Sequence, residues 1–278
     1  HHDELGALDE SVFADGLLKK SVCPTFVVDG PYKNTQATLA RFRSLHEYGV
    51  IAIAGHGDSY FRSLSLGAKA GYGWSHRYSH ELIWTGEPMD CSKLVQSSPS
   101  CTGPGSCPEG SQCVVTGAQT VGTSLTGSCI DYKQLDLRTG RAVMGPDRYG
   151  IVPSFFKHYR GNGFPDSLVY LGTCRSLWNG TLGMELFGAG VKTIAGYSGY
   201  VTSEFAHERG TDFFVGVVEQ GLVTGETLPE DPVEDPAYPG TSLHLLGAPN
   251  LTVTDSSLIN PSWETGNLTG WQSTGDGR

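Results

Sequence analysis

Two short apolar runs, each ending in a reactive side chain, constrain this chain more than any other feature. The first run, VIAIAGHG, begins at residue 50 and contains His56. The second run, SLVYLGTC, ends at Cys174. Neither run alternates apolar with polar residues, so each predicts a strand buried on both faces, as in parallel sheets. Because ligands of open parallel sheets bind at the carboxyl ends of strands, we expect an imidazole and a thiol at one sheet edge.

The rest of the pattern indicates the fold class. Strands are predicted at 24–30, 50–55, 167–173 and 191–199 and late in 241–255, and helices at 35–49, 176–190 and 202–222. Residues 57–90 are irregular and aromatic and show neither the strand nor the helix pattern of apolar residues. Strands that alternate with helices predict an α/β fold with a mainly parallel sheet flanked by helices.

Composition divides the chain into three parts. Residues 1–22 are polar and are expected to form an N-terminal arm, and residues 23–256 form the main domain. Residues 257–278 are rich in Gly, Ser, Thr and Trp, which predicts the start of a further β module or a linker.

Charge and hydropathy exclude two classes of partner. The net charge of −10 argues against nucleic acid, because phosphate binding needs basic surface. No apolar stretch reaches the ~18 residues of a membrane helix, so we expect no membrane span. The oligomeric state is not fixed by the sequence.

The chain has seven cysteines, and five of them lie between residues 91 and 129. This density among Ser, Gly and Pro predicts a disulfide-rich insertion over residues 91–140 and a secreted or cell-surface protein. Zinc is the alternative, but no C-x2-C pair is present. Since the number is odd, at least one thiol is expected to be unpaired unless the chain pairs with another, and Cys174 is the candidate. Cys23 either pairs with the remaining cysteine of the insertion or stays a small buried residue.

The motifs A-G-H-G at 54–57 and G-T-C at 172–174, followed by a helix and a strand, resemble the caspase-like (clan CD) cysteine peptidases, closest in character to the gingipain and clostripain group. The resemblance covers about residues 24–255. His56 and Cys174 are 118 residues apart (174 − 56), more than is usual in that family, and the insertion accounts for much of the excess. Ala248 also stands where the family more usually has Asp.

The resemblance implies a secreted cysteine endopeptidase that acts on peptides or proteins. Cys174 would be the nucleophile and His56 the general acid and base, with backbone N–H groups of Gly57 and Cys174 as the oxyanion hole. No metal or other cofactor is required, although a structural calcium ion would be compatible with the family. The alternatives are a structural cysteine at a strand end and a structural histidine in a turn.

Substrate preference is predicted from acidic residues. Asp29 follows the first predicted strand, where gingipain-like enzymes place an acidic pocket residue, which would favour cleavage after Arg or Lys. The sequence D-G-P is also a strong turn signal, which favours a turn role for Asp29. Glu204 and Asp212 are the other acidic candidates, although solvated or helix-capping roles are favoured for both.

The segment after the fourth predicted strand is expected to bind the substrate backbone as an edge strand. This segment consists of Tyr197, Ser198, Gly199 and Tyr200. Ordinary exit of the chain from a strand is the alternative.

Two other readings stay open. One is a catalytically inactive caspase-like binding module; the other is a cell-surface adhesion protein that binds glycan through Trp263 and Trp271. His76 and His80 have the spacing of metal ligands on a helix, but their aromatic, irregular surroundings favour a hydrogen-bonded surface pair.

Overall fold

The computed structural model describes residues 2–22, 25–61, 79–90, 99–103, 105–115 and 127–253. Its centre is a five-stranded sheet in the order β1-β9-β10-β12-β11. The strands are β1 (Val50–Ala54), β9 (Leu168–Gly172), β10 (Thr193–Tyr197), β12 (Tyr238–Gly247) and β11 (Glu234–Asp235). The first three are parallel to one another, and β12 runs antiparallel to β10.

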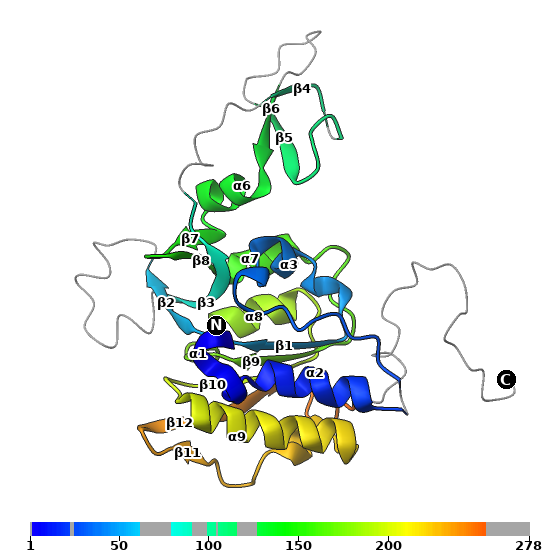
Figure 1. Cartoon of the computed structure of the whole chain (residues 1–278), viewed down its shortest axis with the longest axis vertical. Coiled ribbons are helices and arrows are strands. Elements are labelled where there is room, and N and C mark those ends of the chain that lie inside the picture. The colour runs from blue at the N-terminus through cyan, green and yellow to red at the C-terminus, as the bar shows by residue number, and fades with distance from the viewer. Residues whose placement is uncertain are drawn as a thin grey trace, which may run out of the picture.

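Helices cover both faces of this sheet (Figure 1). On one face lie α2 (Glu10–Lys20) and α9 (Ser203–Phe214), which a π-helix extends over Val215–Glu219. On the other lie α3 (Leu39–Arg43), α7 (Pro153–His158) and α8 (Thr181–Gly188). The prediction of an α/β sheet of mostly parallel strands flanked by helices is therefore confirmed.

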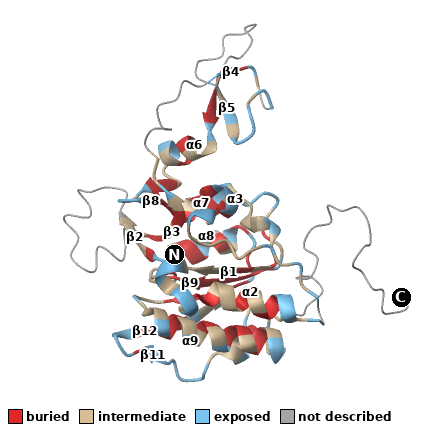
Figure 2. Cartoon of the chain, in the orientation of Figure 1, coloured by how far each residue is buried: buried red, intermediate tan, exposed pale blue. Residues whose placement is uncertain are grey.

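The core has two layers because the central strands are apolar on both faces. All five residues of β9 and of β10 are buried, and the buried colour of Figure 2 runs along these strands. Ile51, Val169 and Ile194 pack towards α3, α7 and α8, whereas Leu168 and Tyr170 pack towards α2 and α9.

The N-terminal residues are part of this core. The short helices α1 (His2–Leu5) and η1 (Gly6–Leu8) lead into α2, whose Ala14 and Leu17 are buried. Asp9 caps α2 through the N–H groups of Ser11 and Val12. The expected polar arm is thus a helix that closes one face of the sheet.

A second, antiparallel sheet lies beside the first, in the order β2-β3-β8-β7. Its strands are β2 (Gly57–Phe61), β3 (Ser79–Pro88), β8 (Arg148–Ile151) and β7 (Ala142–Met144). β2 starts directly after His56, so the candidate base lies at the junction of the two sheets.

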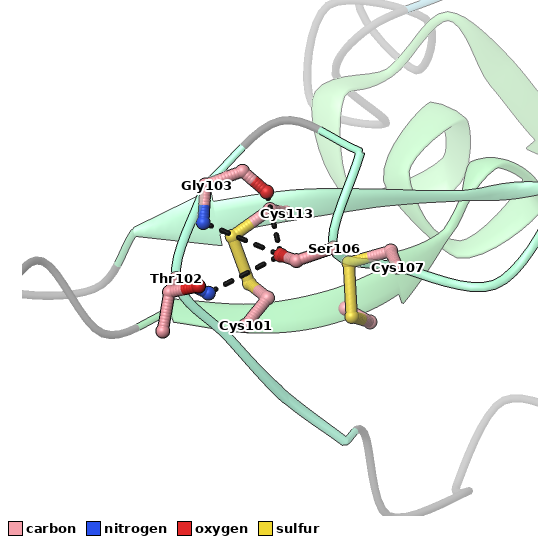
Figure 3. The surroundings of a disulfide bond; sticks show 7 residues. Cys101, Thr102, Gly103, Ser106, Cys107 and Cys113 are labelled. Atoms are coloured by element: carbon pink, nitrogen blue, oxygen red, sulfur yellow. Dashed lines mark hydrogen bonds between the residues drawn. A yellow bond between two sulfur atoms is a disulfide. The ribbon is translucent and has the colours of Figure 1, made fainter.

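A third, small sheet stands at one end of the molecule beyond α6 (Tyr132–Thr139) (Figure 1). It has the order β4-β6-β5, formed by β4 (Ser100–Cys101), β6 (Gly127–Asp131) and β5 (Ser111–Val115). Disulfides join Cys101 to Cys113 and Cys107 to Cys129. Between them the Ser106 hydroxyl accepts from the N–H of Thr102 and of Gly103, as Figure 3 shows.

Some predicted elements differ from the structure. Residues 25–33 form no strand, and Val27 in this segment is 97% exposed. The helix predicted at 35–49 is divided into η2 (Asn34–Gln36), α3 and η3 (Leu45–Glu47), because the Thr38 side chain caps a new helix at Leu39. Only one of the late strands, β12, is present among the described residues up to 253.

Several predictions fall on residues outside the described part of the chain. These are the pairing of Cys23, the role of His76, the glycan platform of Trp263 and Trp271, and the character of residues 257–278. Within the described ranges, none of the helices has the length and hydropathy that crossing a membrane requires.

Candidate active site

Two neighbouring parallel strands bring His56 and Cys174 to the same sheet edge. Ala54 of β1 lies opposite Gly172 of β9, and the N–H of Gly55 donates to the Gly172 carbonyl at 3.1 Å. His56 and Cys174 each follow two residues after these paired positions. The expected shared edge is therefore present, at the carboxyl ends of both strands.

Gly57 explains why the chain can pass so close to the cysteine. A Cβ atom at this position would lie 2.1 Å from the carbonyl oxygen of Cys174 and 3.0 Å from Oγ1 of Thr173. Only glycine fits there, so the backbone that carries the imidazole lies directly against the backbone that carries the thiol.

Cys174 is a free, half-buried thiol. Its Sγ accepts from the N–H of Val201 at 3.5 Å, and its S–H donates to the Val201 carbonyl at 3.6 Å. Burial raises the pKa of the thiol; the Val201 N–H and Arg175 oppose this effect, and Asp58 adds to it. At neutral pH the resting group is thus a thiol, which needs a base before it becomes a nucleophile.

His56 is held by a residue that the sequence did not indicate. Nε2 of His56 lies 2.5 Å from Oε2 of Glu4, to which it donates its proton. Oε1 of the same carboxylate accepts from Arg148 at 3.4 Å. The hydrogen bond from His56 lowers the pKa of Glu4, with Arg148 contributing. A proton kept on Nε2 makes Nδ1 the basic nitrogen of the neutral ring.

Glu4 could not be identified from the sequence because it lies 52 residues before His56 (56 − 4), on the four-residue helix α1. No local spacing links the two positions. Glu4 reaches His56 only through the tertiary fold, because α2 packs on the sheet and places α1 at the carboxyl edge of the sheet.

Asp29 is placed in a different cavity. Its carboxylate accepts from the hydroxyls of Tyr32 and Tyr48, and the bond from Tyr32 is the main cause of its lowered pKa. The cavity of about 190 Å³ that Asp29 lines runs along the outer edge of β1, and neither His56 nor Cys174 lines it. The acidic residue that contributes to the pKa of the Cys174 thiol is instead Asp58 on β2, which raises it.

The expected edge strand after β10 is absent. Tyr197 is fully buried and pairs with Leu243 of β12, and the N–H of Ser198 bonds to the same strand. The carbonyl of Gly199 accepts from the N–H of Arg175 at 2.7 Å. Tyr197, Ser198 and Gly199 thus each have a backbone group bonded to β12 or to the turn at residues 174–177 (the cysteine turn), and binding of a substrate backbone here stays a prediction. Tyr200, 41% exposed, keeps its ring beside the site.

The described residues contain one cysteine-rich cluster with the spacing of metal ligands, formed by Cys101, Cys107 and Cys129. All three sulfurs are in disulfides, so they do not offer the thiolates that a metal needs. His80 lies in β3 opposite Tyr60, not on a helix.

Comparison with known proteins gives no identification: no protein-family model, no curated protein and no solved structure matches this chain. The arrangement of His56, Cys174 and Glu4 is therefore the feature of this chain that indicates a function.

Proposed function

We propose that this protein is a secreted or cell-surface cysteine endopeptidase of the caspase-like type, with Cys174 as nucleophile and His56 as acid and base. The observation that supports it best is the junction at Gly57, where the turns after two adjacent parallel strands touch. The carboxyl edge of a parallel sheet is where such folds bind ligands.

The chemistry follows the ordinary course of a thiol peptidase. His56 takes the proton of Cys174, and the thiolate attacks the scissile carbonyl. Backbone N–H groups of Gly57 and Cys174 would bind the oxyanion, and His56 would return the proton to the leaving amine. Water then hydrolyses the thioester. Glu4 holds the imidazole in one orientation throughout.

We also propose cleavage after Arg or Lys, with Asp58 rather than Asp29 as the acidic residue that attracts the substrate side chain. Asp58 is about half exposed and acts on the thiol's pKa, whereas Asp29 lines another cavity. A cationic substrate side chain would therefore approach Asp58, whose carboxylate also accepts from Arg175 at 3.4 Å, rather than Asp29.

The test is hydrolysis of a fluorogenic peptide library varied at the residue before the cleaved bond. Wild type, Cys174→Ala and His56→Ala would be compared in the presence of reductant, with and without calcium. Cleavage by wild type that both variants lack would support the peptidase. Cleavage that persists in Cys174→Ala would rule out this nucleophile.

A catalytically inactive binding module is the second candidate. It is favoured by the raised pKa of Cys174 and by the engagement of its Sγ with the Val201 backbone. Absence of cleavage, together with slow alkylation of Cys174 in native protein and fast alkylation in denatured protein, would favour this candidate.

A further inference from the structure

Arg175, the residue after the candidate nucleophile, has an unusual backbone. Its φ is 57°, in the left-handed region that residues other than glycine rarely adopt. Such a conformation persists where surrounding contacts over-determine it, and it occurs preferentially at functional sites. The contacts that hold Arg175 in this conformation therefore indicate its role.

The backbone of Arg175 joins the cysteine turn to the segment after β10. Its N–H donates to the Gly199 carbonyl at 2.7 Å, and two residues later Leu177 donates to Tyr197 at 2.9 Å. These bonds fix the turn to the segment that also carries Val201, the residue bonded to Sγ of Cys174.

The side chain of Arg175 joins the same turn to β2. Nη1 donates to Oγ of Ser59 at 2.9 Å and approaches Oδ1 of Asp58 at 3.4 Å. β2 begins at Gly57, next to His56, so this contact connects the cysteine turn to the strand that the histidine precedes.

Two aromatic rings lie against the guanidinium of Arg175. Its central carbon lies 4.0 Å from the ring centroid of Tyr200 and 4.8 Å from that of Trp178. The Arg175 side chain is only 20% exposed, so these contacts are largely shielded from water. A planar fork that bonds and stacks together is a property of arginine that lysine lacks.

We infer that Arg175 is a positioning residue: it clamps the Cys174 turn to the His56 strand and to the Tyr200 segment, and thereby sets the relation of thiol to imidazole. This inference rests on the proposed peptidase function. The clamp works through the shape of the guanidinium, since Asp58 offsets much of its charge.

The experiment compares wild type with Arg175→Met, Arg175→Lys and Arg175→Gly, with Arg160→Met as a matched surface control. Glycine accepts the positive φ without strain, so Arg175→Gly removes the side chain while relaxing the backbone. Two readouts are used: kcat and KM on the best library peptide, and the pH profile of Cys174 alkylation by iodoacetamide, followed by mass spectrometry of the Cys174 peptide.

All three Arg175 variants are expected to lose at least tenfold in kcat while KM changes less than twofold, and their alkylation profiles are expected to shift along the pH axis. Arg160→Met is expected to match wild type. Wild-type kcat and an unshifted alkylation profile in Arg175→Gly would overturn the inference, and full rescue by Arg175→Lys would show that charge rather than shape matters.

If wild type cleaves no peptide, the proposed function fails, yet the alkylation profiles still decide whether Arg175 controls the thiol. If the Arg175 variants do not fold, Ser59→Ala removes one end of the clamp and leaves Arg175 in place. An unchanged alkylation profile in Ser59→Ala, with folded protein by circular dichroism, would then count against the clamp.

Discussion

Glu4 and Glu10 are six residues apart, yet their surroundings shift their pKa values in opposite directions. Glu4 is half exposed, and its carboxylate is stabilised by the hydrogen bond from His56. Glu10 is 1% exposed, and burial raises its pKa to about 8. The first carboxylate is suited to orient an imidazole, and the second is a cost to the fold wherever it is ionised.

Replacing Glu4 by Gln is expected to lower kcat/KM about tenfold, since orientation of the base is a small part of the ~10²–10⁴-fold that general acid–base catalysis contributes. The amide keeps the shape but no longer holds the Nε2 proton through a charge. Asp3→Asn on the same short helix is the control, measured with the same peptide. If the proposed activity of Glu4→Gln equals that of this control, Glu4 does not orient His56.

Glu10 predicts a pH dependence of stability. Oε1 of Glu10 has no hydrogen-bond partner among the described residues and occupies the space that a side chain at Gly172 would fill, 1.8 Å from the Cβ position. Between pH 4.5 and about 8 the unfolded chain loses this proton while the folded protein keeps it. The free energy of unfolding therefore falls as pH rises through this window, by on the order of 5 kcal/mol at most.

Glu10→Gln stays neutral at every pH, so its unfolding free energy is expected to fall less between pH 5 and 8.5 and to exceed that of wild type at pH 8.5. Urea denaturation at several pH values measures this, with the exposed Glu219→Gln as control. An identical slope in Glu10→Gln and wild type would contradict the assignment.

At the scale of elements, continuous apolar runs were sufficient to predict β1, β9 and β10 to within two residues at each end. Such runs have one stable position, between two layers of helices. The second sheet was missed because β3 contains the buried, charged Glu81, a residue type that counts against a strand core. The strand predicted at 24–30 is the opposite case, because residues 25–30 are not a strand in the structure. An apolar run forms a strand only where a neighbouring strand pairs with it.

Glu81 is tolerated in β3 because it caps α8. Its Oε1 accepts from the N–H groups of Asn179 and Gly180 at 2.7 and 2.9 Å, and its Oε2 accepts from that of Leu182 at 2.5 Å. Burial raises the pKa of Glu81, and these donors, at the start of the helix that follows the cysteine turn, oppose that rise. Glu81 thus connects the second sheet to the start of α8, the helix that follows Cys174 in the chain.

Glu81→Gln is expected to destabilise the protein by about 2–3 kcal/mol, because an amide NH₂ must replace one acceptor among buried N–H donors. The fall in Tm measured by calorimetry checks this, with Glu185→Gln on the same helix as control. A Tm within one degree or so of the control would contradict the capping role, given the ~2–4 °C expected per kcal/mol in larger domains.

At the scale of the whole molecule, the described part of the chain has its disulfides concentrated at one end. Cys101 and Cys129 are 2% and 4% exposed and, with Ile130, form the buried centre of the small sheet. The two main sheets are stabilised by apolar layers instead. The small sheet is therefore expected to unfold separately from the two larger sheets and their helices (the main body) when its disulfides are reduced.

The double variant Cys101→Ser/Cys113→Ser opens a loop with a sequence separation of 12, for which loop entropy gives about 3 kcal/mol of stabilisation. Hydrogen exchange is expected to show lost protection of β5 and β6, while β9 and β10 keep theirs. The proposed peptidase activity is expected to stay near that of wild type, because His56, Cys174 and Glu4 lie outside the small sheet. Matched loss of protection in β9 would mean that the small sheet and the main body unfold as one unit, and that reductant in an activity assay acts on the fold as well as on the thiol of Cys174.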